Sequence, residues 1–151
     1  MKVYLDTTVL IAYLFGELSD TDAERQAFAS GMFEMINIAA DIEAFVSLYS
    51  LQELAIFAYD NYASDDAPTV LRLAVLMLFQ NEVTLLPLLD RIETLRYRRL
   101  VSIPDRSDQP HVALAMKYQC DCILAYDEHF ARASLVNTMT PDAFVEMLKS
   151  P

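Results

Sequence analysis

The sequence predicts an α/β protein with a three-layer α/β/α arrangement around a central, mostly parallel sheet of four to five strands. Short apolar, β-prone runs alternate along the chain with segments of helical periodicity. Strands that alternate with helices are joined by crossovers, which make the sheet parallel and cover both of its faces. The 151 residues are 54% hydrophobic with only two glycines, which predicts one ordered domain spanning residues 1–151.

The first strand and the first two helices are expected within residues 1–36. Residues 3–5 form a short buried strand that stops at Asp6, and a helix over 9–15 follows, with Thr7 and Thr8 as capping residues. A second helix begins near Ser19 or Asp20, and its apolar face carries Phe28, Met32, Met35 and Ile36.

Two further strands and two helices are expected between residues 44 and 87. Residues 44–48 read as a strand ended by Ser50, and a helix follows with Glu53 in its first turn. Pro68 lies at the start of a strongly apolar helix that ends near Phe79, and residues 83–87 form the third strand. The apolar helix is expected to pack in the core, with a dimer surface as the alternative.

The remaining elements follow the same alternation. Helices are expected over about 90–100 and from Asp108 onward, a fourth strand over 123–125, and a fifth over 135–138. Thr140, Pro141 and Asp142 begin the last helix. Cys120 and Cys122 are too close for an easy disulfide and are expected to be small apolar fillers.

The net charge of −11 argues at first against a nucleic-acid partner, because phosphate neutralisation dominates such binding. The charges are unevenly distributed, however. Residues 1–90 hold three Lys and Arg against fourteen acids, whereas residues 91–132 hold seven against six. Arg91, Arg96, Arg98 and Arg99 form either a solvated helix face or a phosphate track. No segment reaches the roughly 20 apolar residues of a membrane span, and the N-terminus lacks a secretory pattern, so the expected compartment is the cytoplasm.

The most informative residues are four acids, Asp6, Glu53, Asp108 and Asp127, each placed where a strand ends or a helix begins. In an open α/β sheet, such positions meet at the edge formed by the carboxyl ends of the strands. Several carboxylates there would suit Mg²⁺ or Mn²⁺, and a bound metal could activate water for phosphodiester hydrolysis. Each acid also has a structural explanation as a helix cap, and Ser50 with Glu53 fits a capping box.

The order of these motifs resembles the PIN-domain ribonucleases, particularly the VapC-like toxins of toxin–antitoxin pairs. The resemblance spans nearly the whole chain and is carried by VYLDTTVL at 3–10, SLQE at 50–53, DQPHVALA at 108–115, ILAYDEHF at 123–130 and TPDAF at 140–144. One position departs from the pattern, because Ala125 stands where many relatives have Ser or Thr. Thr8 is the residue that could supply a comparable hydroxyl near Asp6.

The resemblance implies a PIN-like fold and a metal-dependent endoribonuclease acting on single-stranded RNA. Asp6, Glu53, Asp108 and Asp127 would be its catalytic and metal-binding residues, with Mg²⁺ or Mn²⁺ as cofactor. It also implies a homodimer and a small antitoxin protein whose Arg could pair with the carboxylates and displace the metal. The alternatives are a catalytically inactive PIN-like interaction module and, less well supported, a haloacid-dehalogenase-like phosphatase, which would want a second acid where Thr8 stands.

Five neighbouring residues are expected to have ordinary structural roles. His111 and His129 could face substrate, but they are expected to be partly buried or surface histidines. Asp105 and Glu128 could assist a second metal, but they are expected to be solvated loop charges, and Thr7 is expected to support a helix start rather than catalysis.

Overall fold

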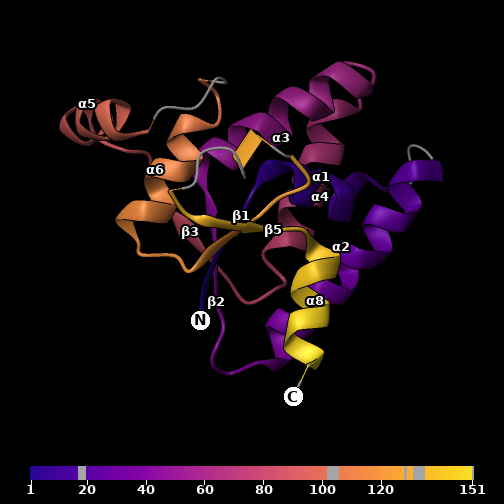
Figure 1. The fold of residues 1–151 in the computed structure, drawn as a ribbon. Helices are drawn as coiled ribbons and strands as arrows, with labels where there is room; N and C mark the ends of the chain where they lie inside the picture. Colours follow the sequence, from indigo (N-terminus) through magenta and orange to yellow (C-terminus); the bar gives the residue numbers. More distant parts are fainter. Residues whose placement is uncertain (17–19, 102–105, 128, 131–134, 151) are drawn as a thin grey trace.

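A five-stranded parallel sheet forms the centre of the protein (Figure 1). The computed structural model describes residues 1–16, 20–101, 106–127, 129–130 and 135–150. The strand order is β3-β2-β1-β4-β5, which comprises β1 (Lys2–Leu5), β2 (Glu43–Ser47), β3 (Val83–Leu86), β4 (Cys122–Leu124) and β5 (Asn137–Met139). The predicted α/β class and the mostly parallel sheet are confirmed.

Helices cover both faces of the sheet, as the alternating pattern predicted. They are α1 (Thr7–Phe15), α2 (Asp20–Ile38), α3 (Leu48–Asn61), α4 (Ala67–Leu78), α5 (Arg91–Leu100), α6 (Gln109–Lys117) and α8 (Pro141–Lys149). None of them, within the described residues, combines the length and apolar character that crossing a bilayer requires.

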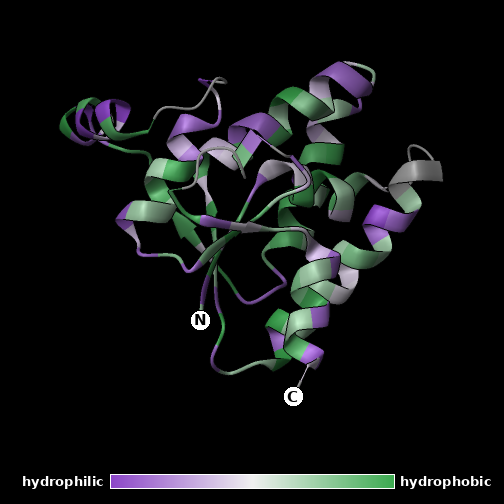
Figure 2. Ribbon diagram, in the orientation of Figure 1, coloured by the Kyte–Doolittle hydropathy of each residue, from purple (hydrophilic) through white to green (hydrophobic). Residues whose placement is uncertain are grey.

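The alternation of side chains along β1 divides the core in two. Val3 and Leu5 pack with α1, α2, α4 and α8 in one cluster, whereas Tyr4 packs with α6 and Phe130 in the other. Hydrophobic residues follow the central strands and the helix sides that face them (Figure 2). The buried aliphatic and aromatic side chains of these clusters remove apolar surface from water, which is the dominant stabilising contribution to folding.

The strand order reverses beside β1. The chain first builds β2 and β3 on one side of β1, then returns to place β4 and β5 on the other. Ligands of open α/β sheets bind outside the carboxyl ends of the strands at such a switch point. The backbone N–H of Asp6 donates to the carbonyl of Leu124 at 3.0 Å, which joins the carboxyl ends of β1 and β4.

Several predicted boundaries were wrong at the helix starts. Helix α1 begins at Thr7, with Asp6 as its N-cap, so Thr7 and Thr8 lie inside the helix. Helix α3 begins at Leu48 and is capped by Ser47, whose hydroxyl accepts the N–H of Ser50 at 3.1 Å. The proposed capping box of Ser50 and Glu53 therefore does not form, and Glu53 lies in the second turn.

Smaller differences concern which side chains are buried. Phe28 was expected in the core but is exposed, and the buried face of α2 consists of Ala29, Met32, Phe33 and Ile36. The fifth strand is Asn137–Met139 rather than 135–138. The expected loop charges at Asp105 and Glu128, and a helix start at Ser19, lie outside the described residues.

Candidate active site

The first part of the site is organised by Asp6 at the end of β1. Its carboxylate is buried, and its Oδ2 accepts the backbone N–H of Thr8 at 2.9 Å and the Thr8 hydroxyl at 2.6 Å. The Thr8 hydroxyl in turn accepts the N–H of Tyr126 at 3.1 Å, which links this carboxylate to the segment after β4. Capping and a functional role are therefore compatible at Asp6, because Oδ1 takes no part in the cap.

His111 connects two of the predicted acids. Its Nε2 lies 3.3 Å from Oε1 of Glu53, and its Nδ1 lies 3.9 Å from Oδ1 of Asp6. The Thr7 hydroxyl donates to Oε2 of Glu53, so this carboxylate is held from two sides. The expectation of a partly buried or surface His111 was wrong, because its exposed fraction is 1%.

Tyr4, on β1, contacts His111 through its hydroxyl group. The Tyr4 hydroxyl lies 2.8 Å from Nδ1 of His111 and donates to the Ser47 hydroxyl at 2.7 Å. An ionised carboxylate only accepts, so Nε2 of His111 must carry the proton that it shares with Glu53. Sequence reasoning missed Tyr4 and Ser47. The available signal was a tyrosine inside a buried strand, because a buried hydroxyl nearly always finds a partner.

Burial and mutual charge shift the pKa values of this group. Burial raises the pKa of the Asp6 carboxyl, and the charge of Glu53 adds to that effect, although His111 and the Thr8 hydrogen bonds oppose it. For His111, burial alone would lower the pKa, but the hydrogen bond to Glu53 and the charges of Asp6, Glu53 and Asp108 outweigh it and raise the pKa. A raised pKa in each group means that the apo site retains protons more readily than free side chains would.

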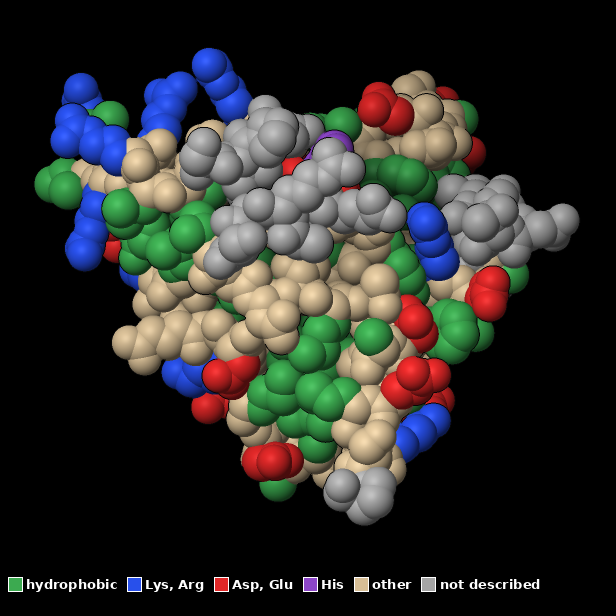
Figure 3. Space-filling model, viewed as in Figure 1, with side chains coloured by type: hydrophobic (Ala, Val, Ile, Leu, Met, Phe, Trp, Pro, Cys, Tyr) green, Lys and Arg blue, Asp and Glu red, His purple; other side chains and the backbone are tan. Residues whose placement is uncertain are grey.

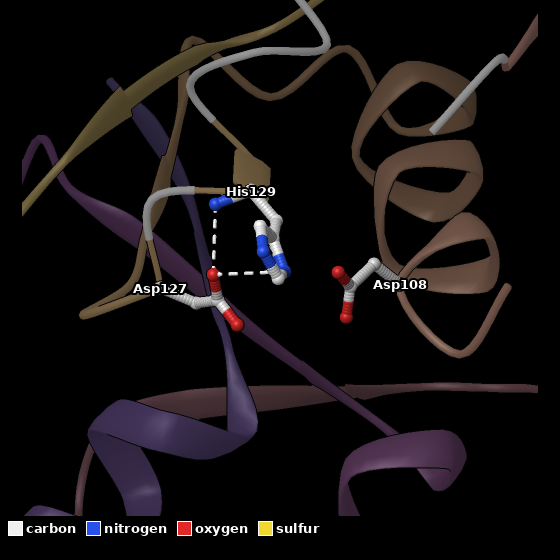
Figure 4. Close-up of side chains that lie close together, drawn as sticks. All are labelled: Asp108, Asp127 and His129. Atoms are coloured by element: carbon white, nitrogen blue, oxygen red, sulfur yellow. Dashed lines mark hydrogen bonds and ion pairs between the residues drawn. The ribbon is translucent and has the colours of Figure 1, made fainter. Parts of the chain in front are cut away.

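The second part of the site joins Asp108 and Asp127. One carboxylate oxygen of each, with one ring nitrogen of His129, lie within 4.8 Å of one another. Figure 4 shows Asp108 from the start of α6 facing Asp127 and His129 from the segment after β4. Asp127 accepts the backbone N–H of His129 at 2.7 Å, and its Oδ1 lies 3.3 Å from Nδ1 of that residue. Asp108 makes no side-chain cap hydrogen bond at the start of α6, so the capping explanation fails there.

The two parts adjoin through α6, which supplies Asp108 at its N-cap and His111 one turn later. The structure thus brings the predicted acids together in two groups. Asp6 and Glu53 each lie beside His111, and Asp108 and Asp127 lie beside His129. Two ligands that each lie about 2.1 Å from Mg²⁺ are at most about 4.2 Å apart. The carboxylate oxygens of Asp108 and Asp127, within 4.8 Å of each other, therefore lie close to the separation that a shared cation requires.

Ala125 is buried in the core cluster on the α6 side of the sheet. Thr8 has its hydroxyl engaged as donor to Asp6 and as acceptor from Tyr126. A hydroxyl that could substitute for the one missing at Ala125 is therefore already used to orient Asp6.

A model of the PIN domain family matches residues 3–135, which is most of the chain. The chain belongs to the PIN domain family. No curated protein matches its sequence. The PIN-like fold suggested by the sequence motifs is confirmed.

Several solved structures share the fold at low sequence identity. One is VapBC2 from Rickettsia felis bound to a promoter DNA fragment, with a TM-score of 0.61, 12% identity, and coverage of 93% of this chain and 98% of the other. Another is VapC20 from Mycobacterium tuberculosis, described as a sarcin–ricin loop cleaving toxin, with a TM-score of 0.63, 17% identity, and coverage of 89% and 96%. VapBC-1 from nontypeable Haemophilus influenzae has a TM-score of 0.60, 16% identity, and coverage of 93% and 98%.

Proposed function

We propose that this PIN domain, residues 1–151, is a metal-dependent endoribonuclease that hydrolyses phosphodiester bonds in single-stranded RNA. The observation that carries the proposal is the gathering of Asp6, Glu53, Asp108 and Asp127 at the switch point of a PIN fold. Carboxylates that repel one another at such a site favour a hard cation as their common partner.

The four carboxylates are the proposed ligands of Mg²⁺ or Mn²⁺, directly or through water. A bound cation would activate a water molecule and neutralise charge that develops on the phosphoryl oxygens. The protein supplies the orientation. Thr8 fixes one oxygen of Asp6 and leaves the other toward His111, while Thr7 and His111 hold the two oxygens of Glu53.

The test uses the purified protein, freed of any partner, with a mixture of structured and unstructured RNA. Cleavage should require Mg²⁺ or Mn²⁺, stop with a chelator, and be lost in Asp6→Asn and Asp108→Asn. A metal titration of the same variants separates the nuclease from a catalytically inactive interaction module. Saturable binding by the wild type that both substitutions abolish supports the nuclease, whereas absent binding by the wild type, or cleavage that survives Asp6→Asn, contradicts the proposed site.

The proposed biological role is the toxin of a toxin–antitoxin pair in the cytoplasm. The similar solved structures from Rickettsia felis and Haemophilus influenzae are VapBC assemblies, which supports a small antitoxin protein as partner. An Arg from such a partner would meet the carboxylates and compete with the cation.

A homodimer is proposed through α4. This helix buries Ala74 and Leu78 in the core, but Leu73, Leu76 and Met77 on its other side are 51%, 57% and 45% exposed. Exposed large apolar side chains gathered on one surface are typical of protein interfaces. Both expectations for the apolar helix thus have support, one for each of its sides.

A further inference from the structure

An arginine-rimmed pocket lies between α5 and the start of α6, outside the carboxylate site. Its lining includes Tyr49, Tyr97, Arg98, Arg106, Gln109 and Pro110, and we call it the arginine pocket. Its volume is about 180 Å³. Pockets that enclose drug-sized ligands have roughly 300–1,000 Å³, so this one suits a single ring system rather than a whole cofactor.

The packing of α5 against α6 sets the position of the pocket. Nζ of Lys117, the last residue of α6, lies 2.5 Å from Oε1 of Glu93 in the first turn of α5. Tyr97 and Arg98, in the last turns of α5, line the pocket with Gln109 and Pro110 from the first turn of α6. The two helices are therefore antiparallel, and the end of α5 shares the pocket with the first turn of α6, which follows Asp108.

Tyr49 joins the pocket to the carboxylate site. Its ring centroid lies 6.3 Å from that of His111, which contacts Glu53, and the same side chain lines the arginine pocket. Tyr49 and Glu53 are four residues apart on α3 and so share one face of the helix. A ligand in the pocket would thus be separated from the carboxylate site by little more than one tyrosine ring.

Charge indicates what the pocket would bind. Figure 3 shows Lys and Arg side chains gathered over α5 and the neighbouring end of α6, in a protein whose net charge is −11. The carboxylate site repels a polyanion, so RNA needs an anchor beside it. Aromatic side chains stack on bases, and arginines pair with phosphates, in sites for single-stranded nucleic acids.

We propose that the arginine pocket is a nucleotide subsite of the RNA substrate, which holds the nucleotide next to the scissile phosphate. Tyr97 and Tyr49 contact the base, and Arg98 and Arg106 contact its flanking phosphates. The inference rests on the proposed ribonuclease function, and it assigns the phosphate track expected from the sequence to two particular arginines. The other arginines of α5 lie outside this lining; Arg96 packs over the Tyr97 ring at 5.9 Å, and Arg96 and Arg99 line a separate hollow.

The test measures binding of a fluorescein-labelled, unstructured ten-nucleotide RNA to the full chain by anisotropy in chelator, where cleavage cannot occur. Arg98→Ala/Arg106→Ala should weaken binding and lower the slope of log affinity against log salt by about 1.4, at roughly 0.7 for each phosphate contact with a single strand. Arg99→Ala is the matched control, because Arg99 shares the last turn of α5 with Arg98 but lies outside the lining. Its salt slope should stay close to that of the wild type.

The base contact has its own comparison. Tyr97→Ala should weaken binding about fivefold or more, since base stacking contributes roughly 1–3 kcal/mol per base. Tyr59→Ala, at a tyrosine of α3 that is 55% exposed and outside the lining, should leave affinity unchanged. Circular dichroism of each variant establishes that it is folded.

The outcomes separate the subsite from the nuclease. If the wild type cleaves RNA with Mg²⁺ but the pocket variants bind like their controls, the subsite is overturned and the proposed function stands. If RNA binding depends on the pocket but no cleavage occurs, the pocket binds RNA, but the nuclease fails and the role of the pocket as a substrate subsite fails with it. Failure of the wild type to bind the RNA, or equal displacement of the RNA by oligoglutamate at matched charge, would overturn the subsite, because the pocket would then be no site or only a generic anion site.

Discussion

Replacing Tyr4 by Phe tests whether the buried hydrogen-bond chain beneath the site has the energetic role that its geometry indicates. The substitution removes one hydroxyl and keeps the ring, so it opens no large cavity among the core residues. The Ser47 hydroxyl retains the N–H of Ser50 at 3.1 Å and the Ser50 hydroxyl at 3.2 Å. Nδ1 of His111 loses the partner that lies 2.8 Å away, at a residue only 1% exposed.

The expected cost follows from that unpaired nitrogen. Leaving a buried polar group without its partner costs about 1–3 kcal/mol of unfolding free energy. For a chain of this size, each kcal/mol lowers the melting temperature by about 2–4 °C, so the expected decrease is about 2–12 °C.

The assay is urea denaturation at pH 7 with chelator, performed as a double-mutant cycle with His111→Leu. Once the imidazole is gone, Tyr4→Phe should cost less, by a coupling free energy of about 0.5–3 kcal/mol. Equal costs of Tyr4→Phe in both backgrounds would refute the reasoning, because the hydroxyl would then act independently of His111.

The same cycle has a second readout at the proposed metal site. His111→Leu removes a hydrogen-bond partner of Glu53, and loss of such a partner typically lowers metal affinity about 10- to 100-fold. Calorimetric titration with Mn²⁺ measures this decrease. Unchanged Mn²⁺ affinity in His111→Leu would show that the imidazole does not orient Glu53 for metal binding.

Three further predictions concern stability and assembly. The folded-state pKa of His111 is raised, so its stabilising contribution is complete below its ordinary pKa of about 6.5 and is lost as pH rises through the folded value. The metal-free protein should therefore have a lower free energy of unfolding at pH 8.5 than at pH 6. His111→Leu should flatten that dependence on pH. Ser47→Ala should lower the unfolding free energy by at least about 1 kcal/mol in the same denaturation assay, because it removes the cap of α3. Thr140→Ala is the control: this helix start has no side-chain cap hydrogen bond, so the substitution should cost less than about 0.5 kcal/mol. Leu76→Lys should shift a dimer toward monomer in sedimentation velocity, and an unchanged sedimentation coefficient would exclude this side of α4 as the dimer surface.

Much of the fold could be predicted because local patterns and tertiary packing agree. The apolar runs of β1 and β4 are buried strands. The segment expected to be helical over about 90–100 forms α5, which begins with the Asp90 capping box. The helix starts near Asp6 and Ser47 were harder to place. Several neighbouring residues there have capping side chains, and the choice among them depends on where the strand hydrogen bonds stop.

The candidate site was predictable in its acids but not in its supporting residues. Asp6 and Asp127 follow strands, which parallel topology places at one sheet edge. Tyr4 and His111 are 107 positions apart, and nothing local pairs them. Their contact exists only because the Tyr4 side chain points to the face of the sheet that α6 covers.

The sequence by itself determined the PIN-like α/β class and singled out four acids as candidate metal ligands, because periodicity and short motifs are local properties of the chain. Tertiary structure alone decided that His111 is a buried link between Asp6 and Glu53, that Asp127 shares its group with Asp108, and that Arg98 and Arg106 border one pocket. The physical reason is that each of these arrangements depends on which surfaces pack together. Packing joins residues that are distant in sequence, through contacts that no local pattern encodes.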